Sequence, residues 1–341
     1  MPPAPLAGPA QPPGPHPALP RGIAPIGRIP VTDVLPSVDG GTRAAKSVVD
    51  EQFWIQARVF REGHDAVNAT AVLTDPDGVD HAFPMTSVNV GLSLWNVQVS
   101  ADRAGWWTYR VEGWSDPWET WVHDGTIKVE AGIDEELMLE EGARVVEHAL
   151  AALPDSAPAS ARAELRDVVT ALRDPNRPPI ARLRAAKAPE VHAIFAAYPF
   201  REKVSPSAAY PLLVERELAL FGAWYEIFPR SEGATKDPVT GTWTSGTFRT
   251  AAKRLPAIAA MGFDVVYLTP IHPIGTTARK GKNNTLVALP GDPGSPYAIG
   301  SPDGGHDALH PELGTFEDFD AFVAEAGRLG MEVAMDIALQ C

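Results

Sequence analysis

Cysteine pairs, long apolar runs and an excess of basic residues are all missing from this 341-residue sequence. The single cysteine, Cys341, leaves no disulfide framework, and no apolar run approaches the roughly 18 residues that cross a membrane. Asp and Glu number 43 against 29 Lys and Arg, so the net charge is -14. This charge argues against nucleic acid or an anionic membrane as the main partner. We therefore expect a soluble protein of the reducing cytoplasm.

The signatures of several common active sites are missing as well. The sequence has no Ser/His/Asp pattern with nucleophile-elbow spacing, no Cys/His spacing for a metal and no Gly-rich loop that would cradle a phosphate. Function has to be sought in other patterns.

Both ends of the sequence are unusual. The first twenty residues contain nine prolines and no apolar signal-peptide core, so we expect residues 1–27 to be a disordered tail. At the other end, Cys341 directly follows a strand-like segment, with no cap, helix or polar tail after it. Because a buried parallel strand needs neighbours on both sides, we expect the sequence to be the N-terminal fragment of a longer protein.

Residues 28–133 alternate apolar and polar side chains in short segments, separated by turns such as the hairpin-type turn at residues 75–78. This pattern predicts an antiparallel β-sandwich, to which an extended segment near residues 208–217 returns as a last strand. Five tryptophans fall within sixteen positions, and their rings could serve a core or stack on sugars; we favour the core. They are Trp106, Trp107, Trp114, Trp118 and Trp121.

The period becomes helical over residues 134–207. Asp134 is placed to cap a first helix, and successive apolar stripes, one through Val146 and another through Leu165, predict a small helical bundle inserted after the sandwich. A run of glutamates could form a metal cluster, but a solvated acidic helix face is the stronger interpretation. These residues are Glu135, Glu136, Glu140 and Glu141.

From residue 218 onward, three short apolar runs alternate with two helical patterns. The runs cover residues 221–228, 265–268 and 331–339 and are rich in β-branched and aromatic side chains, as in strands buried in a parallel sheet. The helical patterns cover residues 247–261 and 316–329, and the second opens on a capping box of Thr315 and Asp318. This βαβαβ order predicts a parallel α/β unit.

About forty residues rich in Gly, Pro, Asn and Asp, residues 272–314, follow the second of these strands. We call this segment the long connection. Because it leaves the carboxyl end of a parallel strand, where α/β barrels build their sites, we favour a functional role. Its basic cluster, residues 279–285, could bind sugar hydroxyls or a phosphate, with Gly281 admitting backbone N–H groups; a solvated turn is the more common alternative.

A few further polar residues are candidates for the same site. Tyr297 could stack on a sugar ring, and His306 and Asp307 could orient each other, although turns of this composition are usually only turns. Asp336 falls inside the third strand, where a carboxylate needs a partner, so a structural role is expected. Gln340, at the exit of that strand, is placed to touch a ligand.

Together these residues resemble glycoside hydrolase family 13, the α-amylase family, at residues 264–270, 295–297, 310–315 and 331–341. The family's first conserved region usually reads Asp, three residues, Asn, His, whereas Gln340 and Cys341 occupy the last two places here. The sequence is similar to one subfamily, the α-1,4-glucan:maltose-1-phosphate maltosyltransferases. That resemblance rests on residues 221–226, 279–285, 300–307 and 338–341, and on the order of sandwich, helical insert and barrel.

The resemblance implies a multidomain fold, in which the sandwich with its helical insert precedes the first three βα units of a truncated (β/α)8 TIM barrel at residues 218–341. It also implies a homodimer and a retaining transfer of maltosyl units from maltose 1-phosphate to the non-reducing end of α-1,4-glucans. The resemblance further implies that phosphate is released, that the pathway is glycogen or α-glucan biosynthesis, and that no metal or organic cofactor is needed.

The resemblance also assigns site residues. Lys280 and Gln340 match positions that contact maltose 1-phosphate, and Tyr297 matches a sugar-stacking position. The nucleophile and the acid/base carboxyl follow the fourth and fifth strands, beyond residue 341, so the sequence is expected to be inactive by itself.

Two other interpretations stay open. One is a hydrolase or trehalose-forming enzyme of the same barrel, which product analysis with and without phosphate would separate. The other, from a different class, is a glucan-binding module that uses the sandwich tryptophans, and glycogen binding by residues 28–134 alone would favour it.

Overall fold

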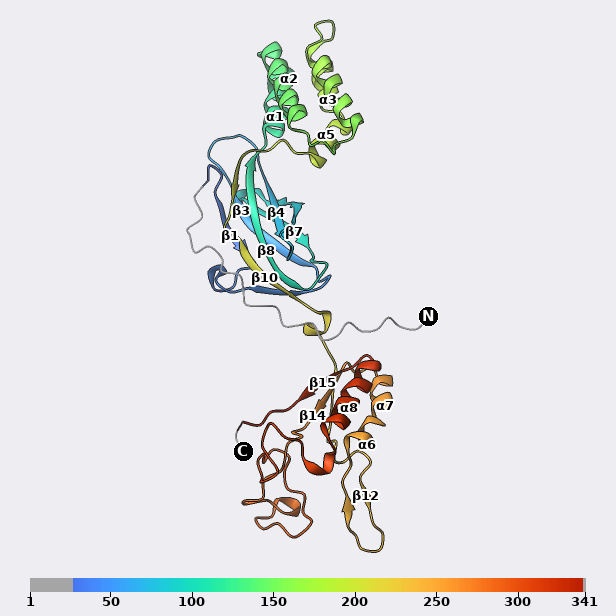
Figure 1. The fold of residues 1–341 in the computed structure, drawn as a ribbon. Coiled ribbons are helices and arrows are strands. Elements are labelled where there is room, and N and C mark those ends of the chain that lie inside the picture. The colour runs from blue at the N-terminus through green and yellow to red at the C-terminus, as the bar shows by residue number, and fades with distance from the viewer. Residues whose placement is uncertain (1–26, 340–341) are drawn as a thin grey trace. The chain divides into compact units, whose positions relative to one another are not determined.

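A computed structural model describes residues 27–339 of the chain, shown as a ribbon in Figure 1. They form two compact units, an N-terminal unit that ends at Arg216 and a C-terminal unit that begins at Glu217. Apart from Gly27, the tail expected at residues 1–27 lies outside the described residues. Within the part of the chain that is described, no helix has the length and apolar character needed to cross a bilayer.

Two β-sheets make up much of the N-terminal unit. The smaller sheet is antiparallel throughout, in the order β1-β3-β7-β6. The larger sheet runs β2-β10-β8-β4-β5, with β9 also paired to β8, and its β2–β10 pair is parallel. The strands are β1 Val31–Leu35, β2 Ala45–Val48, β3 Phe53–Val59, β4 Val67–Thr74, β5 Asp80–Pro84, β6 Thr86–Asn89, β7 Leu94–Val99, β8 Gly105–Ser115, β9 Glu202–Pro206 and β10 Tyr210–Glu215.

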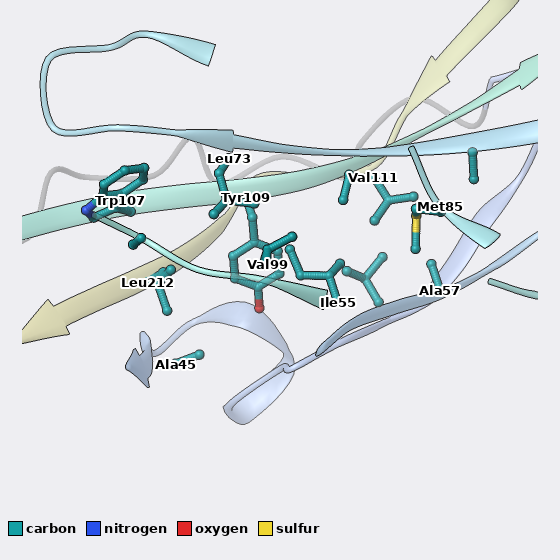
Figure 2. Packing of buried hydrophobic residues seen from close by; sticks show 14 of the residues in the cluster. Ala45, Ile55, Ala57, Leu73, Met85, Val99, Trp107, Tyr109, Val111 and Leu212 are labelled. Atoms are coloured by element: carbon teal, nitrogen blue, oxygen red, sulfur yellow. The ribbon is translucent and has the colours of Figure 1, made fainter. Parts of the chain in front are cut away.

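The inner faces of the two sheets share one apolar core, which makes the unit a β-sandwich. Ile55 and Val99 come from the smaller sheet, and Tyr109 and Leu212 come from the larger one; Figure 2 shows them pointing toward one another. The expected return strand is present as β10, and it lies inside the larger sheet, between β2 and β8.

The turn predicted at residues 75–78 joins β4 to β5. The Asp75 carboxylate accepts hydrogen bonds from the backbone N–H groups of Asp77 and Val79, both at 2.9 Å, and pairs with Arg103 at 2.6 Å. Gly78 adopts a φ of 83°, which an L side chain rarely tolerates.

Helices begin earlier than we expected. The sandwich pattern was read through residue 133, but α1 already starts at Pro117, because Asp116 caps it by accepting from the Glu119 N–H at 3.0 Å and proline suits the first helical position. The capping role expected of Asp134 is also wrong, since its side chain makes no capping hydrogen bond. The five helices are α1 Pro117–Glu130, α2 Glu135–Ala152, α3 Ala159–Leu172, α4 Pro179–Ala186 and α5 Pro189–Ala197.

The tryptophans divide between two cores, which confirms the structural interpretation for most of them. Trp107 and Trp114 are buried in the larger sheet, and the Trp114 N–H donates to the Thr70 hydroxyl at 3.1 Å. Trp118 and Trp121 belong instead to the helical core, where Trp118 stacks on Phe195 with ring centroids 4.1 Å apart. Because their rings are buried, these four residues present no stacking platform for a sugar.

The C-terminal unit has a three-stranded parallel sheet in the order β11-β14-β15, as the βαβαβ pattern predicts. A small hairpin, β12–β13, was not anticipated. Short 3-10 turns cover Asp39–Gly41, Val90–Leu92, Glu217–Ala219, Lys282–Asn284 and Pro311–Leu313 in the two units. The strands and helices of the C-terminal unit are β11 Trp224–Ile227, β12 Thr235–Lys236, β13 Trp243–Thr244, α6 Phe248–Ala252, α7 Leu255–Ala260, β14 Val265–Leu268, α8 Phe316–Arg328 and β15 Glu332–Met335.

Three details of this unit differ from or confirm the prediction. The helix expected at residues 247–261 is split into α6 and α7, because Pro256 lacks an N–H and its ring opposes the carbonyl four residues earlier. The capping box of Thr315 and Asp318 at the start of α8 is confirmed. The third strand ends at Met335 instead of residue 339, so Asp336 lies just beyond β15 rather than inside it.

Candidate functional site

The carboxyl ends of the three parallel strands meet at one edge of the sheet. Ile227, Leu268 and Met335 are aligned by the register of β11, β14 and β15. Asp336, the next residue after β15, donates its backbone N–H to the Leu268 carbonyl at 2.9 Å. Its side chain is therefore fixed at the same edge from which the long connection departs.

Asp336 is the centre of a polar cluster with two tyrosines. The hydroxyls of Tyr267, on β14, and Tyr297, in the long connection, both interact with its carboxylate, and this interaction raises the pKa of each tyrosine. This finding agrees with the expectation that Asp336 has partners. It also shows that the long connection folds back over the strand ends, since Tyr297 is thirty residues beyond Tyr267 in sequence.

The electrostatics of the cluster hold both tyrosines in the neutral form. The hydrogen bond to Asp336 is the main cause that raises the pKa of Tyr267 to about 12, followed by burial and by the negative charges of Asp336 and Glu226. Burial is the main cause that raises the pKa of Tyr297, and its hydrogen bond to Asp336 adds to it. The cluster thus presents phenol groups beside carboxylates, an arrangement suited to bind hydroxyl groups.

Two histidines pack beside one another at the start and near the end of the long connection. The ring centroids of His272 and His306 are 5.4 Å apart. The Nδ1 atom of His272 lies 3.0 Å from the Ala308 carbonyl oxygen, and Nε2 of His306 lies 2.8 Å from that of Ala338. His306 is therefore oriented by the segment after β15, and not by Asp307 as the sequence suggested.

The basic cluster is held by one of its own members. The Arg279 guanidinium donates to the carbonyls of Gly275 at 2.9 Å, Ile274 at 3.1 Å and Asp292 at 3.3 Å, which closes the long connection on itself. Gly281 donates its N–H to the Thr285 carbonyl at 3.0 Å. That N–H is consequently used within the turn and is not among the backbone groups that could meet an anion.

The three predicted site residues fare differently. Tyr297 joins the Asp336 cluster and keeps an exposed edge. Lys280 is exposed, and its ammonium group makes no hydrogen bond or ion pair with any other described residue. Gln340 lies outside the described residues. The structure therefore joins Tyr297 to Asp336, and it does not link Lys280 to them by a polar contact.

Sequence reasoning missed Tyr267. We treated residues 265–268 as one buried run, yet Tyr267 is half-exposed and its hydroxyl reaches Asp336, while Val266 and Leu268 on either side are buried in the core. The available signal was the one polar group in an otherwise aliphatic strand. A parallel sheet with a polar cluster at its carboxyl edge defines the class of this unit, an α/β unit with a candidate site at its strand ends.

Comparisons with known proteins identify the family to which the chain is similar. Residues 27–216 match the family model described as α-1,4-glucan:maltose-1-phosphate maltosyltransferase, domain N/S. The chain is 57% identical over 317 residues to α-1,4-glucan:maltose-1-phosphate maltosyltransferase 1 of Streptomyces coelicolor, across 93% of this chain and 46% of that protein. It is 45% identical over 342 residues to the maltosyltransferase of the same name from Mycobacterium tuberculosis H37Rv, across 92% of this chain and 48% of the relative.

A solved structure is also similar to part of the chain. An α-amylase from Lactobacillus plantarum shares 35% identity, covers 34% of this chain and 22% of its own, and has a TM-score of 0.24.

The family model covers more than half of the chain. The chain therefore belongs to the α-1,4-glucan:maltose-1-phosphate maltosyltransferase family, as its sequence motifs implied. It spans about half the length of the curated relatives that it matches.

Proposed function

We propose that this chain is the donor-binding part of a retaining maltosyltransferase. The reaction moves a maltosyl unit from α-maltose 1-phosphate to the non-reducing end of an α-1,4-glucan and releases phosphate, in glycogen or α-glucan biosynthesis. One observation carries the proposal: the chain is 57% identical, over 93% of its length, to a relative named for this donor and this glucan.

We also propose a domain organisation. The parallel strands β11, β14 and β15, with helices between them, would be the first three βα units of a (β/α)8 barrel. Supporting this, β11 and β15 are the outer strands of the described sheet, and Trp224 on β11 is 57% exposed, as expected of a surface that further strands cover. The helices from α1 to α5 would form an insert in the sandwich domain, because they lie between the paired strands β8 and β9.

The chemistry assigns binding roles, not bond cleavage, to this chain. In a retaining transfer one carboxylate attacks the anomeric carbon, and the C–O bond to phosphate breaks as a second carboxyl group donates its proton to the leaving phosphate. The resulting carboxylate then removes the proton of the incoming glucan hydroxyl, whose oxygen displaces the first carboxylate from the anomeric carbon. We place both carboxyl groups in the part of the relatives that this chain does not span. Tyr297 would stack on a sugar ring with its hydroxyl held by Asp336, and the Lys280 ammonium, together with Gln340, would contact the donor's phosphate end.

Calorimetric titration of the 341-residue chain with maltose 1-phosphate and with maltose tests these roles. Lys280→Ala should weaken binding of maltose 1-phosphate about tenfold or more, because a charge-assisted hydrogen bond is lost, and should leave maltose binding unchanged. The matched control is Lys253→Ala, at another exposed lysine of the same unit. Equal affinity of the Lys280→Ala and wild-type chains for maltose 1-phosphate would contradict the assignment.

The reaction itself is tested in two ways. The 341-residue chain should release no phosphate from maltose 1-phosphate, and measurable release would overturn the placement of the carboxyl groups. A protein of the relatives' full length should extend glucans by maltosyl units when maltose 1-phosphate is supplied. Free maltose or trehalose as the main product would indicate the hydrolase or trehalose-forming alternative instead.

The homodimer and the cytoplasmic location belong to the same proposal. They derive from the resemblance to the family, and sedimentation of the purified protein and fractionation of the producing cells test them.

A further inference from the structure

The outer face of the smaller sheet carries a tryptophan that the fold does not use. Along β3, Ile55, Ala57 and Val59 point into the sandwich core, where Figure 2 shows the first two, so the intervening side chains point outward. Trp54 is one of these and is 55% exposed. An exposed indole offers a flat apolar face with an N–H donor at its edge, which is the combination that a ligand can stack on.

Uncharged amide side chains surround Trp54 on this face. By register, Gln98 lies directly opposite Trp54, and Gln56 lies opposite Asn96 in the next outward row. Thr86 on β6 continues that row beyond Asn96. Directly opposed side chains are about 5 Å apart and successive outward rows about 7 Å apart, so the indole and three carboxamides form one continuous surface.

Among the described residues, these amides have no hydrogen-bond partners. None of the side chains of Gln56, Asn96 and Gln98 makes a hydrogen bond to another residue in the range 27–339. Each carboxamide offers two N–H donors and a carbonyl acceptor, which is the combination that pairs of sugar hydroxyls require. The face is thus supplied with polar groups that are free to bind a ligand.

The charge of the face identifies the kind of ligand. Arg58, the charged residue that points outward from β3, is neutralised by Asp33 at 2.9 Å and also donates to the Leu92 carbonyl at 2.7 Å. The outward row of β3, which consists of Trp54, Gln56 and the paired Arg58, therefore carries no unpaired charge, although the chain carries a net charge of -14. A neutral ligand rich in hydroxyl groups complements it better than an anion, a cation or a charged protein surface does.

We propose that this face, which we call the Trp54 face, binds α-1,4-glucan chains outside the candidate donor site. The indole would stack against the C–H groups of a glucose ring, and the carboxamides would bind its hydroxyls. The choice of an α-1,4-linked glucan rests on the proposed function, whereas the choice of a neutral polysaccharide rests on the face itself. Such a site keeps the chain on a large glucan through contacts that need no donor.

Affinity electrophoresis of the 341-residue chain in native gels with and without glycogen tests the proposal. Trp54→Ala should weaken retention by glycogen about tenfold, since truncation of a stacked aromatic anchor usually costs that much, and Gln98→Ala should weaken it less. Trp54→Phe should restore part of the retention. The matched control is Trp243→Ala, at a tryptophan of the C-terminal unit that is 60% exposed, and it should leave retention unchanged.

The outcomes separate this proposal from the proposed function. Undiminished retention of Trp54→Ala, or no retention of the wild-type chain, overturns the Trp54 face even if maltose 1-phosphate binds normally. Retention that depends on Trp54 supports the face even if the donor does not bind. If Trp54→Ala changes the sedimentation of the chain and not its retention, the face is a contact between copies and the proposal is wrong.

Discussion

Two glycines that face the same indole allow a direct test of packing in the helical core. A Cβ atom added at Gly142, on α2, would lie 2.1 Å from Cζ2 and 2.2 Å from Cε2 of Trp121. One added at Gly125, on α1, would come no closer than 3.4 Å, to Nε1 of the same ring. The ring has little room to move, because its N–H donates to the Met138 carbonyl at 2.7 Å and Trp118 packs beside it at 5.2 Å between centroids.

The magnitudes follow from the contacts. Alanine in place of glycine inside a helix stabilises it by about 1 kcal/mol, which is the whole effect expected for Gly125→Ala. At Gly142 the overpacking costs about 1–3 kcal/mol, and displacement of the indole loses a hydrogen bond worth about 1 kcal/mol. We therefore expect Gly142→Ala to lower the free energy of unfolding by about 2 kcal/mol, so that the two variants differ by about 3 kcal/mol.

Urea unfolding of the 341-residue chain measures this difference. Tryptophan fluorescence and far-ultraviolet circular dichroism follow the transition of the N-terminal unit, in which both glycines lie. The midpoint should fall for Gly142→Ala and stay or rise for Gly125→Ala. Equal shifts in the same direction would show that the Trp121 ring adapts, and would refute the packing argument.

Two further predictions concern single groups. Asp336→Asn should lower the pKa of Tyr267 from about 12 toward its ordinary value of 10.0, since the interaction with the Asp336 carboxylate is the main cause of the raised pKa. Titration followed by ultraviolet absorbance measures this pKa, and Tyr267→Phe identifies the signal of this tyrosine. Because the folded-state pKa of Tyr267 is raised, the contribution of its neutral form to stability is present below pH 10 and is lost as the pH rises through about 12. A Tyr267 titration that does not shift in Asp336→Asn would contradict the pairing of Tyr267 with Asp336. At the start of α1, burial raises the pKa of Asp116, so the neutral cap in Asp116→Asn should be at least as stable as the wild type at neutral pH. Asp116→Ala, which removes the capping oxygen, should lose about 1 kcal/mol of stability. Thermal unfolding compares the two variants, and equal stability would refute the capping role.

Local patterns were enough to predict the parallel sheet. The β-branched run at Val265–Leu268 gave the bounds of β14, and the capping box before α8 gave the start of that helix. Both signals depend on residues adjacent in sequence, and this is why they could be read without a structure.

Where several local signals competed, the prediction failed. The alternating segments predict strands up to residue 133, although Asp116 followed by Pro117 is a helix start of the usual kind. Pro256 inside an apparently continuous helix was likewise a break signal that the apolar stripe outweighed.

The site was less predictable than the fold because it depends on contacts between distant residues. Tyr297 was a candidate on its own, but its meeting with Asp336 and Tyr267 requires the path of the long connection. The sequence places Arg279 in a candidate binding cluster, but its guanidinium donates hydrogen bonds to the carbonyls of Gly275 and Ile274. Residue spacing alone does not indicate these bonds.

The position of β10 governs the order in which this polypeptide can fold during synthesis. Its partner β8 is complete before the helices are made, yet Leu212 and Val214, which close the sandwich core, leave the ribosome roughly a hundred residues later. At typical elongation speeds the incomplete sandwich lacks β10 for about 5–20 s, and its apolar core stays partly open for that time. During that interval α1 to α5 can assemble, since the buried residues of their core all come from the helices and the segments around them, whereas the sandwich core stays incomplete until β10 is made.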